Sequence, residues 1–122
     1  GIGPFIPHKD SPFSGFPHGN ADLTLLLISI FRLMFPDALI PSTTALNTLS
    51  PGNRLKGILA GANVVMPDIT PETYRKDYEI YDDKACTAEA AEGIAALEKE
   101  LGTIGYSIDY GRGDYPDRKP NP

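Results

Sequence analysis

The sequence has a single cysteine, Cys86, among 122 residues, so no disulfide can form within the chain. It also lacks a long apolar run, because polar side chains interrupt the stretch 23–35, which is shorter than the ~20 residues of a membrane span. We see no charged-then-apolar leader of the secretory kind. From these absences we expect a cytoplasmic protein without a membrane partner.

Positive charge is also scarce: 11 Lys and Arg face 16 Asp and Glu, and the net charge is −5. A general nucleic-acid binder needs clustered basic side chains to neutralise phosphates, and no basic stripe occurs, so we expect no nucleic-acid partner. Proline and glycine are abundant, with 12 of each, and they fall between periodic segments as turns do. Only residues 114–122 are polar and proline-rich enough to predict a disordered tail.

The first half of the chain alternates between strand and helix patterns. In chain order we predict a strand at Gly1–Ile6, a helix from Ala21 to about Phe35 with Asn20 as its N-cap, a strand at Ala38–Ile40, a helix from Ser50 to Gly61, and a strand at Asn63–Met66. Such alternation predicts an α/β fold with parallel strands. The carboxyl ends of parallel strands share one face, which is where we expect function.

The second half of the chain has a different pattern. We predict a short helix at 71–78 and a helix from Ala88 to Leu101, with Thr87 as its cap and Gly102 as its stop. The stretch 106–114 has an irregular pattern without a partner strand.

Two histidines are present, and only His8 follows a predicted strand directly. Its imidazole has two interpretations: it binds an anion or transfers a proton, or it orders the loop 7–12 through a backbone hydrogen bond. His18, His8 and Cys86 lack the paired spacing of a zinc site, so we predict no metal ligands and no catalytic group in this chain.

Three segments carry a family resemblance: "GPFIPHKDSPF", "ALIPSTTALNTLSPGNRLKGILAGANVVMPDITP" and "YRKDYEIYDDKACT". In this order and spacing they resemble the C-terminal part of radical S-adenosylmethionine (SAM) enzymes of the biotin-synthase group, and most closely its hydrogenase-maturation branch. The resemblance implies part of a (β/α) TIM-type barrel. Residues 1–71 would supply three parallel βα units, 72–113 a C-terminal cap related to the biotin and thiamin synthesis associated (BATS) domain, and 114–122 the tail. Because a closed barrel needs about eight strands, we expect the chain to be a fragment of a longer protein.

The resemblance also implies substrate-binding residues. The paired hydroxyls of Thr43 and Thr44 would bind a small anion or a polar substrate group, although they can equally cap the following turn. Met66 would face the cavity at a strand end, although a methionine there is as readily a core residue. Tyr78 and Tyr81 would reach the cavity from the C-terminal segment, or pack the cap. His8 completes the predicted set.

The cofactors of the family are a [4Fe–4S] cluster and S-adenosylmethionine, and the cluster is held by three cysteines in a C-x3-C-x2-C loop. With one cysteine, this chain cannot build that site, so we expect no cofactor in the fragment itself and no activity without the cluster-binding half. Cys86 is interpreted as a lone thiol.

The implied function is maturation of [FeFe]-hydrogenase: the fragment would contribute the substrate cavity in which the diiron subsite of the H-cluster is assembled from an organometallic precursor. The alternatives are an enzyme like biotin synthase or methylornithine synthase, or a non-catalytic module that binds a small molecule or a partner. Biotin synthases carry an arginine in the strand that here contains Ala38–Ile40, and no arginine occurs there. The expected macromolecular partner is the missing N-terminal half of the barrel, or a second copy.

Overall fold

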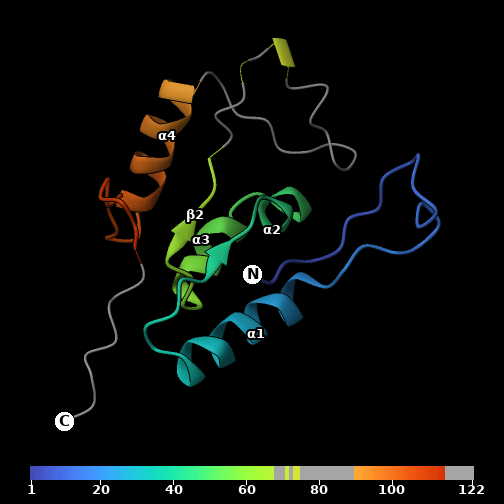
Figure 1. Ribbon diagram of the computed structural model, residues 1–122, viewed down its shortest axis with the longest axis horizontal. Helices are drawn as coiled ribbons and strands as arrows, with labels where there is room; N and C mark the ends of the chain where they lie inside the picture. Colours follow the sequence, from blue (N-terminus) through green and yellow to red (C-terminus); the bar gives the residue numbers. More distant parts are fainter. Residues whose placement is uncertain (68–70, 72, 75–89, 115–122) are drawn as a thin grey trace.

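Two short parallel strands lie at the centre of the fold, with helices around them (Figure 1). The computed structural model describes residues 1–67, 71, 73–74 and 90–114. Strand β1 (Pro41–Ser42) pairs with β2 (Val64–Val65) in the register Pro41↔Val64 and Ser42↔Val65. The parallel pairing confirms what the alternation of strands and helices predicted, and β2 lies within the strand expected at 63–66.

Strand β1 starts one residue after the predicted strand, which was expected to end before Pro41. Ile40 still belongs to the pairing region, because its carbonyl oxygen accepts from the backbone N–H groups of Asn63 and Val64 at 2.9 and 3.1 Å. In a parallel strand successive residues turn their backbone groups to opposite sides, so the nitrogen of Pro41 faces away from β2. The missing N–H of proline therefore costs this pair no hydrogen bond.

The segment 1–6 is not a strand, so this prediction was wrong. The segment nevertheless runs beside β1 in the same direction, because a Cβ on Gly1 would lie 3.3 Å from Pro41 Cγ and one on Gly3 would lie 2.8 Å from Thr43 Oγ1. Pro41 has no N–H to donate towards this segment, and Pro4 has none to donate in return. A hydrogen-bonded ladder therefore does not form here, although the two backbones lie close together.

Helix α1 (Ala21–Met34) forms as predicted. Asn20 is its N-cap: the side-chain Oδ1 accepts from the backbone N–H of Leu23 at 2.9 Å, which satisfies one of the amides that the first turn leaves unpaired. Asp22 lies in the first turn and Arg32 in the last, so both charges are favourable for the helix dipole.

The helix predicted from Ser50 to Gly61 is present as α3 (Asn53–Leu59), and a further short helix, α2 (Thr44–Leu49), precedes it. Helix α3 starts later than predicted because Gly52 has a φ of +86°, which a right-handed helix cannot contain. Helix α2 was not predicted, since the segment after Ile40 was interpreted as a strand-end loop. Gly61 has a φ of +118° and ends the region of α3, as expected.

Helix α4 (Ala90–Gly102) confirms the predicted C-terminal helix, and its proposed cap Thr87 lies outside the described residues. Within the helix expected at 71–78, only Pro71, Thr73 and Tyr74 are described, and Thr73 and Tyr74 form a short 3-10 turn. The tail 115–122 also lies outside the described residues, and the division of the chain at residue 71 stays a prediction.

The hydrophobic core lies between the strands and the helices. Its side chains come from the residues just before β1 and β2 and from α1, α2, α3 and α4. Its buried members are Ile28, Ile40, Leu46, Ile58, Ala62, Leu97 and Leu101. An ion pair adds to the contact between two of these helices: Arg54 on α3 lies 3.1 Å from the carboxylate of Glu100 on α4. The described residues thus form an α/β fold with a parallel pair of strands, as predicted at this level of detail.

None of the helices in the described part of the chain has both the length and the hydropathy required to cross a bilayer.

Candidate functional site at the strand ends

The register of the two strands brings two predicted site residues together. Ser42 pairs with Val65, so extending the register by one residue sets Thr43 beside Met66. Thr43 retains extended backbone angles, with φ −74° and ψ 154°. Extended in this way, the register would place a hydroxyl and a thioether at the carboxyl ends of β1 and β2.

The alternation of side chains assigns both residues to the face of the strands opposite Ser42 and Val65. Ile40 and Ser42 are buried on the helix side, and Val65 packs against the core there. Because side chains alternate between the two faces of a strand, Thr43 and Met66 occupy the opposite face. Met66 is 54% exposed, which is consistent with a position on an open surface.

Thr43 also has a structural task, because it is the N-cap of α2. Its Oγ1 accepts from the backbone N–H of Leu46 at 3.3 Å. The hydroxyl hydrogen of Thr43 is not used in that bond and can donate to a ligand. Gly3 lies against the same hydroxyl, and a Cβ at Gly3 would come within 2.8 Å of it. The capping alternative raised from sequence is thus confirmed for Thr43, and it is compatible with ligand binding.

Thr44 is the first residue of α2 and is half-buried next to Thr43. Its carbonyl oxygen accepts from Thr48 Oγ1 at 3.0 Å. The tight spacing of the two threonines means that any group bound at the strand ends by Thr43 would also lie near the start of α2.

His8 orders its own loop, as one of its two interpretations predicted. Its Nδ1 accepts from the backbone N–H of Asp10 at 3.1 Å, and the backbone carbonyl of His8 accepts from Ser11 N–H at 3.0 Å. The Asp10 carboxylate lies 3.9 Å from the same nitrogen. A role of His8 in substrate binding stays a prediction.

Three residues named from the sequence lie outside the described part of the chain: Tyr78, Tyr81 and Cys86. Within the described residues, no group of three or more His, Cys, Asp or Glu side chains is arranged to hold a metal ion. The single cysteine of the sequence does not fit a cluster that needs three thiolate ligands.

Sequence reasoning missed Ser42, which links β1 to α3 next to the site. Its side chain is only 2% exposed, and its Oγ donates to the backbone carbonyl of Arg54 at 3.0 Å. Helix α3 can approach this closely only because residue 57 is glycine, since a methyl group there would overlap Ser42 Oγ. A glycine in the middle of a helical pattern was the one signal in the sequence that pointed to this close contact.

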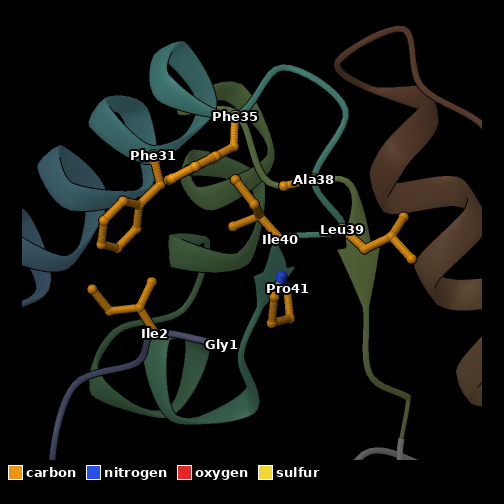
Figure 2. Close-up of a pocket in the computed structure, with 8 residues that line it drawn as sticks. All are labelled: Gly1, Ile2, Phe31, Phe35, Ala38, Leu39, Ile40 and Pro41. Carbon is orange, nitrogen blue, oxygen red and sulfur yellow. The ribbon is translucent and has the colours of Figure 1, made fainter. Parts of the chain in front are cut away.

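A cavity of about 270 Å³ lies near the start of β1 rather than at the predicted site (Figure 2). Its lining is apolar and includes Ile2, Phe31, Phe35, Leu39 and Pro41. In β1 and the residues before it, the lining residues are 38–41, so the cavity lies towards the start of the strand and Thr43 lies beyond its end.

We predict that Thr43→Val destabilises the chain by about 1 kcal/mol, because valine cannot accept the hydrogen bond that caps α2. Thr43→Ser retains the accepting oxygen and should remain within about 0.5 kcal/mol of the original chain. Urea unfolding followed by circular dichroism measures both. Equal stability of the two variants would contradict the capping role.

No protein-family model matches the sequence. The chain is 46% identical over 89 residues to the [FeFe] hydrogenase maturase subunit HydE of Thermotoga maritima, a match that covers 73% of the chain and 26% of that protein. It is 35% identical over 78 residues to 3-methylornithine synthase of Methanosarcina barkeri, covering 64% of the chain and 22% of that enzyme. The chain therefore spans about a quarter of the length of these curated relatives.

Both similarities confirm the resemblance to radical SAM enzymes that the sequence segments indicated. Within that class, the identity is higher to HydE, so the chain is similar to part of a hydrogenase maturase, as expected.

Proposed function

We propose that this chain contributes one wall of the substrate cavity of a HydE-type radical SAM enzyme, and that Thr43, Thr44 and Met66 lie on that wall. The observation that supports the proposal is the register of β1 and β2, because Thr43 and Met66 are the residues that follow the pair Ser42↔Val65 at the carboxyl ends of the parallel strands. Active sites of barrels built from parallel strands lie at this end. The 46% identity to HydE supports the choice of enzyme.

The substrate in this proposal is an organometallic, iron-containing precursor of the H-cluster diiron subsite. The hydroxyl of Thr43 would donate to an anionic or polar group of the precursor, and the polarisable sulfur of Met66 would contact its less polar part. His8, Tyr78 and Tyr81 remain further candidates for the same cavity. The [4Fe–4S] cluster and S-adenosylmethionine would be held by residues outside this sequence, because one cysteine cannot ligate the cluster.

The test uses a full-length chimera in which this chain replaces the matching segment of the Thermotoga maritima protein. We expect Thr43→Val with Thr44→Val to lower hydrogenase maturation at least ~10-fold, about the effect of losing one charge-assisted hydrogen bond to a bound substrate. Cleavage of S-adenosylmethionine to 5′-deoxyadenosine should be retained, since that chemistry belongs to the part outside this chain.

A matched control is Thr48→Val, which removes a hydroxyl from the same helix α2 that donates to the Thr44 carbonyl. This variant should mature hydrogenase normally. If the Thr43 and Thr44 double variant also does so, these threonines do not bind the substrate. If an otherwise active chimera forms 3-methylornithine instead, the function is that of the second relative.

A further inference from the structure

Arg54, the second residue of α3, forms hydrogen bonds with three other elements of the fold. Its carbonyl oxygen accepts from Ser42 Oγ of β1 at 3.0 Å, and its backbone N–H donates to Asn47 Oδ1 of α2 at 3.4 Å. Its guanidinium Nη1 donates to Glu100 Oε2 of α4 at 3.1 Å. Residues of β1, α2 and α4 therefore meet at one position of α3.

Two of these contacts lie on either side of Thr43 in the sequence. Ser42 immediately precedes Thr43, and Asn47 belongs to α2, the helix that Thr43 caps. The Thr43 carbonyl also accepts from the backbone N–H of Asn47 at 3.4 Å. We call residues 42–47 the Thr43 corner. The Thr43 corner is thus held to the backbone of Arg54 at both of its ends.

The side chain of Arg54 fixes its position relative to α4. The Arg54 side chain is 14% exposed and that of Glu100 is 31% exposed, so solvent and salt screen this ion pair less than a pair on the open surface. Glu100 shares a side of α4 with Leu97 and Leu101, which are both buried in the core. Removing either charge would leave the other one unpaired at a partly buried position, which is unfavourable.

We infer that Arg54 is a positioning residue for the proposed substrate site. Its ion pair with Glu100 holds the start of α3 against α4, and its backbone then holds the Thr43 corner in the position that substrate binding requires. A binding group must be held within about 0.5 Å of its productive position, so small shifts of the corner would weaken the hydrogen bond from Thr43 to a substrate. The inference rests on the proposed function, because that proposal assigns the Thr43 hydroxyl to the substrate.

The first measurement is amide hydrogen exchange across the Thr43 corner in the full-length Thermotoga maritima chimera, well below its melting temperature. Arg54→Met retains the backbone and much of the aliphatic stem but removes the charge, so we expect exchange in the corner to become at least ~10-fold faster. Glu100→Gln retains the shape of the partner and should accelerate exchange in the same place by about 3-fold or more. Arg54→Lys can still pair with Glu100 and should stay within about 3-fold of the parent.

Lys56→Met is the matched control, because it removes an exposed positive charge from the same helix α3. It should leave exchange in the Thr43 corner unchanged. Exchange in α1 is the internal reference: a general loss of stability would accelerate α1 and the corner together, whereas loss of positioning accelerates the corner alone.

The second measurement is hydrogenase maturation by the same chimeras. Arg54→Met should lower maturation at least ~10-fold, since a misplaced binding group reduces turnover strongly. Arg54→Lys should restore it to within about 3-fold of the parent. Cleavage of S-adenosylmethionine to 5′-deoxyadenosine should be retained in both variants.

Corner exchange that is the same in Arg54→Met and Lys56→Met, or that rises only in step with exchange in α1, would overturn the inference and leave the proposed function standing. Faster corner exchange with normal maturation would also overturn it, provided that the Thr43 and Thr44 double variant is impaired. If that double variant matures hydrogenase normally, the proposed function fails, and faster corner exchange in Arg54→Met still supports the positioning of Thr43 by Arg54.

Discussion

Gly57→Ala is expected to destabilise the chain by about 3 kcal/mol, the upper part of the usual range for overpacking a core. The added methyl group would overlap Ser42 Oγ and lie 3.1 Å from Ser42 Cβ and 3.2 Å from Leu46 Cδ2. Ser42 and Leu46 are both fully buried, so neither can move aside without shifting β1 or α2. Urea unfolding followed by circular dichroism measures the loss.

Two controls separate overlap from a general effect of alanine. Gly102→Ala changes a glycine at the end of α4 where a Cβ meets nothing within 4 Å, and should be neutral within about 0.5 kcal/mol. Ser42→Ala in the Gly57→Ala background removes the oxygen in the overlap and should restore about 1 kcal/mol. If Gly57→Ala is as stable as Gly102→Ala, the close approach of α3 to β1 is wrong.

Gly61→Ala is expected to cost about 3 kcal/mol, because strain and overlap act together. The backbone φ of Gly61 is +118°, a value that residues with a side chain rarely adopt, and a Cβ there would lie 2.7 Å from Arg32 Cβ. The carbonyl of Gly61 also accepts from Arg32 Nε, so moving the backbone would break the link between α1 and the end of α3.

Gly52→Ala distinguishes the two contributions to this cost. Gly52 has a φ of +86°, but a Cβ there meets nothing within 4 Å, so alanine should add strain alone, about 1 kcal/mol. We therefore expect the free energy of unfolding to fall more for Gly61→Ala than for Gly52→Ala. Equal losses at the two positions would show that contact with Arg32 is unimportant.

Local signals predicted the helices where the relevant atoms lie within a few residues of each other. Asn20 caps α1 because its side chain reaches an amide three residues ahead, which any sequence pattern can reveal. The same type of signal was present in Thr43, which caps α2, and capping was one of the two interpretations of this residue, although no helix was predicted after it. Gly52 was missed because nothing in the sequence shows a positive φ directly.

The strand prediction failed where proline was treated as a fixed boundary. Pro41 is compatible with β1 because its nitrogen faces away from β2. The nitrogen faces Gly1 instead, and because proline has no N–H, this edge of β1 has no donor there for the segment at residues 1–6. Which side a backbone nitrogen faces depends on the register with Val64, more than twenty residues away in the sequence. No short pattern around Pro41 contains that information.

The candidate site was predictable in part. The types of residue at the strand ends, and the resemblance to radical SAM enzymes, indicated Thr43, Thr44 and Met66 before any geometry was known. The pairing of Ser42 with Val65, and the hydrogen bond from Ser42 to the Arg54 carbonyl, depend on how β1, β2 and α3 pack. These contacts link positions 12 or more residues apart, so local patterning cannot determine them.

The sequence by itself determined helices α1, α3 and α4, the parallel direction of the strands, the capping of α1 by Asn20, the end of the α3 region at Gly61 and the similarity to HydE. Each of these depends on residue type, short-range hydrogen bonding or the alternation of local patterns. Only the tertiary structure decided that residues 1–6 stay outside the ladder, that Ser42 is buried against α3 and that Leu23, Leu26, Ile30 and Leu33 of α1 remain exposed. The physical reason is that these features depend on register and close packing between distant segments, which are set by the sum of many long-range contacts.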